Sequence, residues 1–375
     1  MKITDIKTFI VHSIQDNWVF TKVYTDDGIT GIGESSVEGR EDSVVAAIRQ
    51  LKPYLLGKDP FDIEKHQYNM FRDAYWGACA ILCGALSAID GALWDIKGKA
   101  LHVPVYQLLG GAFRKKVRLY ANRWFFGSDT PEALAESAIA TVESGFTALK
   151  WDPFGHAERE ISLAQMKNAM AEVEAVYNAV GNRANLLIEG HGRFNVCTAL
   201  NITRELQAFQ PMFIEEPIMP ENLDALAEVR QKSPVPIAAG ERFYSLYDFR
   251  YAIEKQAVDY AQPDLRVTGG ITAVKKIAAM AESSLVSIAP HNIHGLVGTA
   301  MSLHLMAVIP NASILEYSVE NVPWKSEIFT RTLKAENGFL HVPDCPGLGL
   351  DLIEDAAAKY PYTPKTLIEL MYDNE

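Results

Sequence analysis

The chain has 375 residues, of which 22% are charged and 48% are hydrophobic, and its formal net charge is −12. This composition is that of a globular protein with room for about two or three domains. The excess of acidic residues argues against nucleic acid or an anionic membrane as a partner, because both are bound through dense fields of Lys and Arg.

Targeting and redox signals are sparse. Residues 1–6 contain no apolar signal-peptide core. The most apolar long stretch, residues 78–100, carries four charged side chains, so we expect a buried helix rather than a membrane span. The four cysteines show no Cys-x-x-Cys pair, which predicts free, reduced thiols in a cytoplasmic protein.

The first 113 residues are predicted to form a small α+β domain, because alternating strand patterns come before helical ones. A hairpin turn signal at Asp26-Asp27-Gly28 follows the second alternating segment. The domain is expected to end near Gly110-Gly111. The predicted elements are strands at 3–12 and 19–25 and helices at 43–55, 61–74 and 78–100.

From residue 114 to 335 the pattern changes to short apolar runs separated by helices. Thr130-Pro131 is a helix cap followed by a first-turn proline, and Gly145 ends that helix. Eight strands with helices between most of them indicate a parallel barrel. An open doubly wound sheet is the alternative, but the glycine fingerprint after its first strand is missing. Segment 336–375 does not continue the alternation and is expected to return to the first domain. The predicted strands are 117–121, 148–152, 186–191, 212–216, 237–241, 260–264, 286–291 and 314–317.

Three glutamates stand at the ends of three of these strands. Glu189, Glu215 and Glu241 are evenly spaced, since 215 − 189 = 26 and 241 − 215 = 26, about the length of one strand-helix-strand unit. In a parallel barrel this spacing places the side chains next to one another at the carboxyl-terminal rim. Neighbouring carboxylates repel unless they are protonated or neutralised. A hard divalent cation, Mg²⁺ first, is the simplest neutraliser, so the chain is predicted to be a metal-dependent enzyme.

Two histidines accompany these glutamates. His191 lies two residues after Glu189 and would share its face of the strand. His291 ends a strand, and Asp264 ends the preceding one, so that the carboxylate could orient the imidazole as a general base. Glu316 ends the last strand and could complete the ring as a hydrogen-bond partner.

Several further residues are candidates for substrate binding. Lys150 and Asp152 are expected to share a face of the second barrel strand, and three residues that closely follow the glutamates could hold a carboxylate or hydroxyls or form ordinary ion pairs at the rim. Three aromatic residues placed in first-domain loops could form a lid over the pocket or pack in a core. The three residues that follow the glutamates are Arg193, Asn195 and Arg242, and the three aromatic residues are Trp18, Tyr75 and Trp76.

The sequence resembles the enolase superfamily and, within it, the mandelate racemase-like acid-sugar dehydratases. The resemblance covers nearly the whole chain and is most specific at residues 88–99, 213–217, 239–242, 262–264 and 268–270. Segments 150–155 and 188–195 are most similar to the gluconate dehydratases, with the galactonate dehydratases close behind.

This resemblance implies an α+β capping domain on a modified (β/α)₇β TIM barrel, with Mg²⁺ on the three glutamates. The shared step of the superfamily is removal of a proton α to a carboxylate, with the metal stabilising the enediolate. By similarity, His291 supported by Asp264 is the base at C2, His191 is the acid that protonates the departing 3-hydroxyl, and Glu316 hydrogen-bonds the substrate carboxylate. A homo-oligomer is also implied.

One departure from the racemase pattern bears on the reaction. Racemases and cycloisomerases of this superfamily commonly carry Lys-x-Lys on the second strand, whereas the second of these positions is Asp152 here. An ordinary Asp is a weak base at neutral pH, which favours one-directional elimination. We therefore interpret the sequence as a Mg²⁺-dependent dehydratase that converts a gluconate- or galactonate-like aldonate to a 2-keto-3-deoxy acid. The alternatives are an acid-sugar epimerase or racemase, a glycosidase-type barrel with two carboxylates, and a non-catalytic metal-dependent sugar-acid binding protein.

Overall fold

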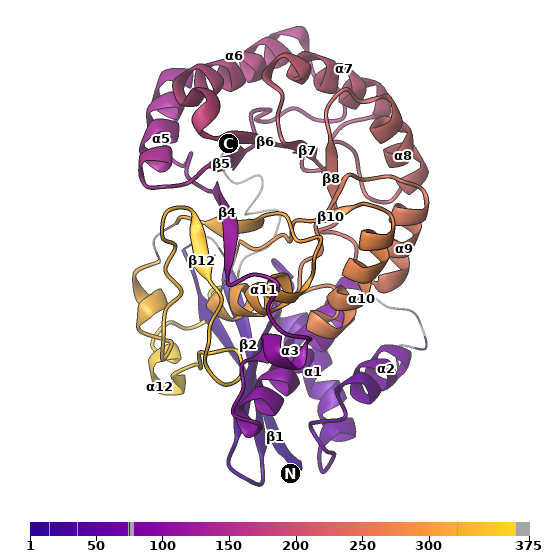
Figure 1. Ribbon diagram of the computed structural model, residues 1–375, viewed down its shortest axis with the longest axis vertical. Helices are drawn as coiled ribbons and strands as arrows, with labels where there is room; N and C mark the ends of the chain where they lie inside the picture. The colour runs from indigo at the N-terminus through magenta and orange to yellow at the C-terminus, as the bar shows by residue number, and fades with distance from the viewer. Residues whose placement is uncertain are drawn as a thin grey trace.

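The computed structural model describes residues 1–14, 16–35, 37–73, 75, 79–293, 295–320 and 322–364. These residues form a small antiparallel sheet with its own helices and a curled parallel sheet that is surrounded by helices (Figure 1). The predicted fold class, a modified α/β TIM barrel with an α+β capping domain, is confirmed.

The capping domain begins with three antiparallel strands in the order β1-β2-β3. The predicted turn at Asp26-Asp27-Gly28 joins β2 to β3, and the positive φ of Gly28, 77°, is the conformation that favours glycine there. The elements are β1 (Ile3–His12), β2 (Asn17–Thr25), β3 (Thr30–Ser35), α1 (Glu41–Leu55), α2 (Ile63–Asp73), α3 (Ala80–Ala100) and α4 (Val105–Leu108).

Strand β3 lies unusually close to helix α3. A Cβ added at Gly31 would lie 2.1 Å from the carbonyl oxygen of Ala92, and one at Gly33 would lie 1.9 Å from that of Ala88. Only glycine permits this approach, because any side chain would collide with the helix backbone. The contact fixes the buried helix α3, predicted from its apolar sequence, directly on the sheet.

The central strand β2 is buried on both faces. Val19 and Val23 pack among the capping helices, whereas Trp18 and Phe20 belong to the core that continues into the barrel, where Phe20 meets Phe329 at a ring-centroid distance of 5.3 Å. The prediction that Trp18 lies in a loop was therefore wrong. The strand begins at residue 17, two residues before the predicted start, and only 2% of Trp18 is exposed.

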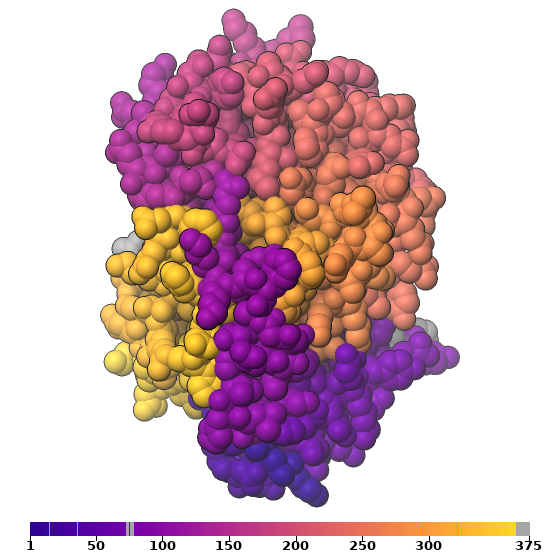
Figure 2. Space-filling view, in the orientation of Figure 1, coloured from indigo at the N-terminus to yellow at the C-terminus, as the bar shows by residue number. Residues whose placement is uncertain are grey.

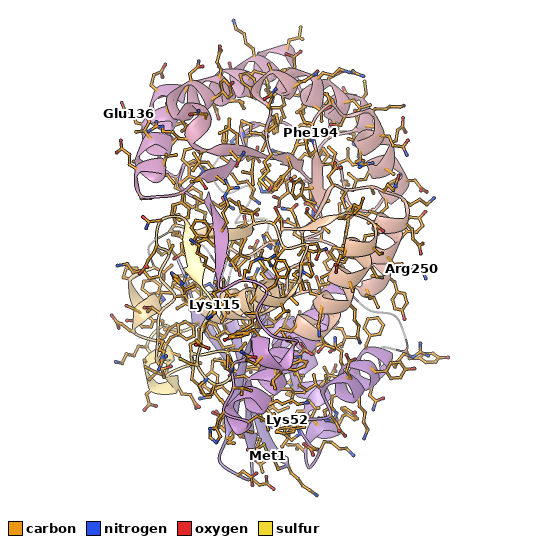
Figure 3. All side chains as sticks on the ribbon, viewed as in Figure 1. Met1, Lys52, Lys115, Glu136, Phe194 and Arg250 are labelled. Atoms are coloured by element: carbon orange, nitrogen blue, oxygen red, sulfur yellow. The ribbon has the colours of Figure 1, made fainter. Side chains whose placement is uncertain are left out.

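Eight parallel strands form the barrel, hydrogen-bonded in the order β10-β9-β8-β7-β6-β5-β4-β11. A parallel bridge between Ile288 and Ala312 connects β10 back towards β11 and closes the ring. Figure 3 shows Phe194, from a loop that precedes a helix, inside the ring of helices, and the helical residues Glu136 and Arg250 on its outside, as expected for the polar face of surface helices.

One helix lies between each successive pair of these strands, which gives the predicted (β/α)₇β order within the described residues. The elements are β4 (Lys116–Asn122), α5 (Pro131–Glu143), β5 (Ala148–Trp151), α6 (Leu163–Val180), β6 (Asn185–Glu189), α7 (Val196–Leu206), β7 (Phe213–Glu215), α8 (Leu223–Lys232), β8 (Ile237–Ala239), α9 (Leu246–Glu254), β9 (Tyr260–Ala261), α10 (Gly270–Ser283), β10 (Ser287–Ile288), α11 (Leu296–Val308) and β11 (Leu315–Ser318), with short 3₁₀ turns η1 (Gly181–Arg183) and η2 (Gln207–Phe209).

Several barrel strands end earlier than predicted. Strand β6 stops at Glu189, β8 at Ala239, β9 at Ala261 and β10 at Ile288. The polar residues that follow are in loops because turns and prolines end the strand conformation there. Side-chain alternation along a strand therefore does not apply to residues beyond these ends.

The end of the chain runs back to the capping domain. Trp324 donates a hydrogen bond from Nε1 to the carbonyl oxygen of His12 at 2.8 Å, and Lys22 pairs with Asp351 at 3.2 Å and with Glu354 at 3.1 Å. Figure 2 shows this segment, in yellow, against the purple capping helices. Its elements are η3 (Pro323–Ser326), β12 (Phe339–His341), which pairs antiparallel with β4, and α12 (Glu354–Ala357).

The exact division at 113/114 and 335/336 stays a proposal, because contacts with the capping domain begin at Trp324 while β12 still pairs with the barrel. The four cysteines are free thiols, as predicted. Among the described helices, none combines the length and the apolar character needed to cross a membrane.

Helix α11 carries a buried histidine. The backbone N–H of Tyr106 donates to Nδ1 of His304 at 3.2 Å, and the two rings stack at 5.9 Å. Burial lowers the pKa of His304 to about 4. The folded protein therefore keeps this imidazole neutral at a pH at which the unfolded chain binds a proton.

We expect this histidine to make the protein less stable as the pH falls from about 6.5 towards 4, because in that window only the unfolded state gains the proton. His304→Gln should reduce the loss of unfolding free energy between pH 7.5 and 5.5 by about 1 kcal/mol. Denaturant unfolding at both pH values measures it. His341→Gln, which replaces an exposed histidine, is the control, and equal pH dependence in the wild type and His304→Gln would contradict the prediction.

Candidate active site

The mouth of the barrel gathers the predicted glutamates. Glu189 and Glu215 are the last residues of β6 and β7 and are direct partners in the parallel register. Because side chains alternate, each lies one layer above a buried residue of the barrel interior, Leu187 or Phe213. Glu215 is opposite Ala238 on β8, so Glu241 lies three residues further along the chain, in the loop after that strand. Equal spacing in sequence thus gives neighbours at the rim, but not three positions at one level.

Lys150 of β5 lies among the carboxylates. Its Nζ is 3.0 Å from Glu189 Oε2, 2.8 Å from Glu215 Oε2 and 2.9 Å from Glu316 Oε1, and only 2% of Lys150 is exposed. Burial lowers the pKa of Lys150, but Glu215 and Glu316 outweigh that effect and hold it well above the ordinary value. The lysine is therefore a fixed positive charge within the site.

One ammonium does not compensate the surrounding carboxylates. Burial and the neighbouring Glu189 raise the pKa of Glu215 well above its ordinary value, against the opposing effect of Lys150. Gln262 donates from Nε2 to Glu215 Oε2 at 2.7 Å, whereas the buried Oε1 of Glu215 has no hydrogen-bond partner among the described residues. Further positive charge would therefore be favourable beside Glu215.

The carboxylates do not already form a closed set of metal ligands. Glu241 Oε2 is 3.3 Å from His291 Nε2, while Lys150 separates Glu189 from Glu215, and no group of three His, Cys, Asp or Glu side chains converges on one point in the described part of the chain. The donor set is nevertheless one that suits a hard divalent cation, because it consists of carboxylate oxygens, one of them buried without a partner.

His291 and Asp264 form the predicted pair. Their Nδ1 and Oδ2 atoms are 2.7 Å apart, which leaves Nε2 of the imidazole facing Glu241 and, at 3.8 Å, Glu316. Burial lowers the pKa of His291, but Glu241 and Glu316 outweigh it and, with Asp264, raise it to about 10. Positive charge bound at these carboxylates would remove part of that stabilisation of the imidazolium.

A second Asp–His pair stands on the other side of the mouth. His191 Nδ1 lies 2.6 Å from Asp152 Oδ2, and the His191 backbone N–H donates to Glu189 Oε1 at 2.8 Å. Burial lowers the pKa of His191, but Glu189 and the hydrogen bond to Asp152 raise it to about 9. Asp152, whose role the sequence left open, is thus the side chain that holds the imidazole of His191 at Nδ1.

His191 lies at the mouth as predicted, but the reason given, a strand face shared with Glu189, was wrong. Strand β6 has ended at Glu189, and His191 adopts a positive φ of 47° in a turn between two glycines, so it does not share a strand face with Glu189. The shared strand face predicted for Lys150 and Asp152 does not apply either, because β5 ends at Trp151 and Asp152 lies beyond it.

An arginine holds each of the two aspartates. Arg193 Nη2 lies 2.6 Å and 2.5 Å from the two oxygens of Asp152, and Arg266 donates from Nε to Asp264 Oδ1 at 3.0 Å. Arg193 was predicted either to bind substrate or to form an ion pair at the rim, and its guanidinium pairs with Asp152 and donates to the backbone carbonyls of residues 190 and 155.

The surroundings of the other predicted residues are as follows, and the ion pair of Arg242 is the alternative that the sequence left open for it. Asn195 caps helix α7 by accepting from Thr198 N at 2.8 Å, because it stands at the start of that helix. Arg242 pairs with Glu216 at 2.6 Å. Tyr75 is 86% exposed, and Trp76 lies outside the described residues, so the aromatic lid stays a prediction.

Glu316 is held from three directions. Its Oε1 contacts Lys150 and accepts from Asn122 Nδ2 at 2.7 Å, and its Oε2 accepts from the backbone N–H of Asn292 at 2.9 Å. The side chain is fully buried. Glu316 is therefore a fixed part of the lining of the mouth next to His291.

Sequence reasoning did not single out several residues of the mouth. Gln262 and Arg266 flank Asp264 within two residues, and that spacing was the available signal. Glu38 comes from the capping domain: burial and Asp16 raise its pKa to about 7 against an opposing effect of His291, which indicates that Glu38 lies near this histidine. No local pattern indicates this approach, because the two segments are far apart in the chain.

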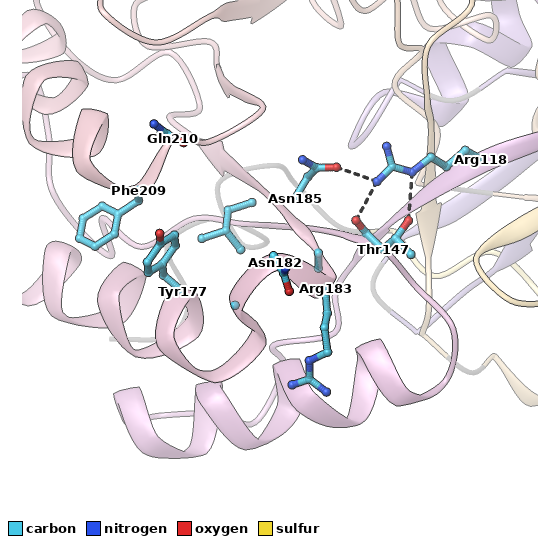
Figure 4. Close-up of a pocket in the computed structure, with 11 residues that line it drawn as sticks. Arg118, Thr147, Tyr177, Asn182, Arg183, Asn185, Phe209 and Gln210 are labelled. Atoms are coloured by element: carbon cyan, nitrogen blue, oxygen red, sulfur yellow. Dashed lines mark hydrogen bonds between the residues drawn. The ribbon is translucent and has the colours of Figure 1, made fainter.

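A cavity of about 440 Å³ lies at the opposite, amino-terminal ends of β5 and β6 (Figure 4). There Arg118 donates to the Thr147 carbonyl at 2.8 Å and to Asn185 Oδ1 at 2.7 Å. These bonds tie together the starts of neighbouring strands, and the cavity contains none of the residues of the mouth.

Comparison with known proteins agrees with this geometry. Residues 4–110 match the family domain described as "Mandelate racemase / muconate lactonizing enzyme, N-terminal domain", and residues 133–356 match "Enolase C-terminal domain-like". The chain belongs to the mandelate racemase/muconate lactonizing enzyme family of the enolase superfamily. The predicted resemblance is confirmed.

Similar proteins are named for one type of reaction. A D-galactonate dehydratase of Ralstonia pickettii (strain 12J) is 38% identical over 94% of this chain and 93% of its own, and a D-gluconate dehydratase of Thermoproteus tenax is 36% identical over 93% and 71%. A solved mandelate racemase/muconate lactonizing enzyme from Jannaschia sp. CCS1 superposes with a TM-score of 0.91 at 32% identity, covering 97% of this chain and 99% of that one. The predicted enzyme class, a hydro-lyase of a superfamily whose dehydratases depend on a metal, is confirmed.

We expect Lys150→Met to destabilise the fold by about 3–5 kcal/mol, because it leaves buried carboxylates without their cation. Added Mg²⁺ should recover part of that loss if the carboxylates bind it. Thermal and denaturant unfolding with and without Mg²⁺ measures both effects. The control is Lys232→Met, which breaks an exposed pair with Glu228 and should cost less than about 0.5 kcal/mol. Equal stability of the two variants would contradict the prediction.

Proposed function

We propose that this protein is a Mg²⁺-dependent sugar-acid dehydratase, which removes the C2 proton and the 3-hydroxyl of an aldonate and releases a 2-keto-3-deoxy acid. The observation that carries the proposal is the presence of two aspartate-supported histidines, from different strand ends, at one barrel mouth. β-Elimination needs such a pair, because one group takes the proton at C2 while another protonates the hydroxyl that leaves C3.

The metal would be held by Glu189, Glu215 and Glu241. Removing a proton next to a carboxylate places a second negative charge on that group, and a divalent cation supplies several kcal/mol of stabilisation for it. The unpartnered Oε1 of Glu215 and the excess of buried carboxylates support this assignment. Glu241 points to His291 and would have to turn towards its fellow ligands.

His291 would act as the base. Asp264 would accept a hydrogen bond from Nδ1, so that Nε2, once positive charge bound at the neighbouring carboxylates lowers the pKa of the imidazole and Nε2 loses its proton, would present its lone pair to the substrate C2. The proton taken from C2 then resides on Nε2, and Asp264 stabilises the resulting imidazolium. Glu316, fixed beside it, would contact the substrate carboxylate.

His191 would act as the acid. Its Nδ1 is engaged by Asp152, which leaves Nε2 to deliver a proton to the departing hydroxyl. The side chain is 43% exposed, on the open side of the mouth, where water could form and leave. Two positioned groups of this kind each contribute roughly 10²–10⁴-fold to the rate.

The surroundings of Asp152 favour elimination over epimerisation. In a two-base racemase the corresponding position carries a lysine that can exchange a proton, whereas here Asp152 is bound by His191 and Arg193. It supports the acid and is not placed to act as a second base. Exchange at C2 without loss of water would favour the epimerase alternative.

The names of similar proteins support an aldonate as the substrate, with D-galactonate and D-gluconate as first choices. Glu38 and Asp16 of the capping domain, and Arg123, which follows barrel strand β4 and pairs with Asp16, could bond hydroxyls at the distal end of the sugar acid. A homo-oligomer located in the cytoplasm is also part of this proposal.

The two histidines should separate the two half-reactions. In Mg²⁺ and D₂O, His291→Asn should lose both deuterium exchange at C2 and dehydration. His191→Asn should lose dehydration but keep some exchange, and it should still eliminate fluoride from a 3-fluoro analogue, whose leaving group needs less protonation. NMR of the substrate and detection of 2-keto-3-deoxy acid measure these outcomes. The reverse pattern would mean that acid and base are exchanged.

Glu215→Gln should weaken Mg²⁺ binding and abolish turnover while the fold is retained, because the amide removes one anionic ligand but keeps the shape. Calorimetric titration with Mg²⁺, far-ultraviolet circular dichroism and a screen of aldonates provide the measurements. Glu228→Gln, on the exposed face of α8, is the control. Full activity of the wild type in excess chelator would refute the metal assignment.

A further inference from the structure

One carboxylate of the capping domain, that of Glu34, contacts the barrel. Glu34, on β3, is fully buried, and its Oε1 and Oε2 accept hydrogen bonds from the backbone N–H groups of Gly295 at 2.9 Å and Gly298 at 2.8 Å. These amides belong to the start of α11, where helix N–H groups have no partner within the helix. A negative charge is stabilised there by the helix dipole. Glu34 thus fixes β3 of the cap onto α11 of the barrel.

Arg266 lies between Glu34 and the catalytic pair. Its Nη1 is 4.0 Å from Glu34 Oε1. Its backbone N–H and Nε donate to Asp264 Oδ1 at 2.8 and 3.0 Å, and its Nη2 pairs with Asp264 Oδ2. Only 1% of Arg266 is exposed. Oδ2 also contacts His291 Nδ1, so buried polar groups follow one another from Glu34 of the cap through Arg266 to the imidazole, and the step from Glu34 to Arg266 is a 4.0 Å approach rather than a hydrogen bond.

Two glycines make room for this series. A Cβ at Gly295 would lie 2.6 Å from Glu34 Oε2, and a Cβ at Gly298 would lie 2.5 Å from Arg266 Cδ. Both distances are too short for real atoms. The backbone of α11 therefore closes against the two side chains, which leaves neither of them an alternative position without a shift of the helix.

We propose that Arg266 and Glu34 are positioning residues for His291, and that Glu34 makes the alignment of the base depend on the seated capping domain. The physical reason is that Arg266 binds both oxygens of Asp264 and so fixes the plane of the carboxylate that receives the imidazole N–H. Without it, Asp264 could rotate, and Nε2 of His291 would lose its fixed direction. The inference rests on the proposed function only in naming His291 as the base.

The second histidine is supported differently. Arg193, behind Asp152, binds the carbonyls of residues 190 and 155 and is partly exposed. All of these groups belong to barrel loops. Among the residues that the structure describes, the hydrogen-bond partners of Arg193 all come from the barrel, whereas Arg266 also lies next to Glu34 of the capping domain. This difference predicts that loosening the cap affects proton removal at C2 first.

The test compares Arg266→Met, Arg266→Lys and Glu34→Gln with a matched control. Lys99→Met removes a cation from the buried Asp95, 2.7 Å away, at a part of the capping domain that does not contact the catalytic pair. For each full-length variant we would measure kcat, KM, deuterium exchange at C2 and unfolding. The Nδ1–H proton of His291, assigned by its loss in His291→Asn, would be followed by ¹⁵N-histidine NMR.

We expect Arg266→Met to lower kcat and C2 exchange about 10–100-fold with little change in KM, and to shift or broaden the Nδ1–H resonance. Arg266→Lys should retain more kcat and C2 exchange than Arg266→Met and a resonance closer to that of the wild type. Glu34→Gln should change these quantities in the same direction as Arg266→Met, but by less. Lys99→Met should lose stability but keep kcat, exchange and the resonance.

Unchanged exchange and an unchanged resonance in folded Arg266→Met would overturn the proposal, as would equal losses of kcat in Arg266→Met and Lys99→Met. If Arg266→Met does not fold, Glu34→Gln decides: an unaltered resonance and exchange rate would overturn the coupling to the cap. A wild type that turns over no sugar acid with Mg²⁺ would instead contradict the proposed function, while the resonance would still test the positioning.

Discussion

Compensation of buried negative charge is the constraint on which the barrel mouth depends. Glu189, Glu215 and Glu316 surround a single ammonium, that of Lys150, within hydrogen-bond distance. Taking several carboxylates out of water is costly unless positive charge accompanies them. The mouth therefore favours whatever brings more positive charge, whether a divalent cation, a protonated imidazole or an arginine. This preference makes the site suitable for binding an anionic substrate that a protein of net charge −12 would otherwise repel.

The same constraint explains how the two histidines are arranged. Each imidazole contacts an aspartate through Nδ1, so that Nε2 is the nitrogen turned away from that aspartate. Each aspartate in turn pairs with an arginine. Burial raises the pKa of Asp264, but Arg266 and His291 outweigh that effect and lower the pKa to about 2, so Asp264 stays ionised. An ionised partner fixes the tautomer of the imidazole and stabilises its cation. The proposed acid and the proposed base therefore share one arrangement of side chains and differ in their surroundings.

Position in the fold gives the two pairs different degrees of freedom. The pair at His291 is buried under the capping domain and reaches Glu34 through Arg266, while the pair at His191 sits in a glycine turn at the open edge of the mouth. A base that removes a weakly acidic proton gains from rigid placement and exclusion of water. An acid that releases a water molecule gains from access to solvent.

The sequence by itself determined the strand-helix alternation, the identity of the glutamates and histidines, and the pairing of His291 with Asp264, because these follow from local periodicity and from the order of parallel strands. It could not give the exact ends of the strands, and so it misjudged why His191 reaches the mouth: a turn with positive φ replaces the strand there. The partners of Asp152, Arg193 and Asn195 were also decided only by the tertiary structure, since they come from loops and helix starts whose geometry depends on their neighbours. The contact of Glu34 with α11 joins residues 261 positions apart. No pattern within one segment encodes such a contact; it exists because the folded cap and barrel bury complementary charges against each other.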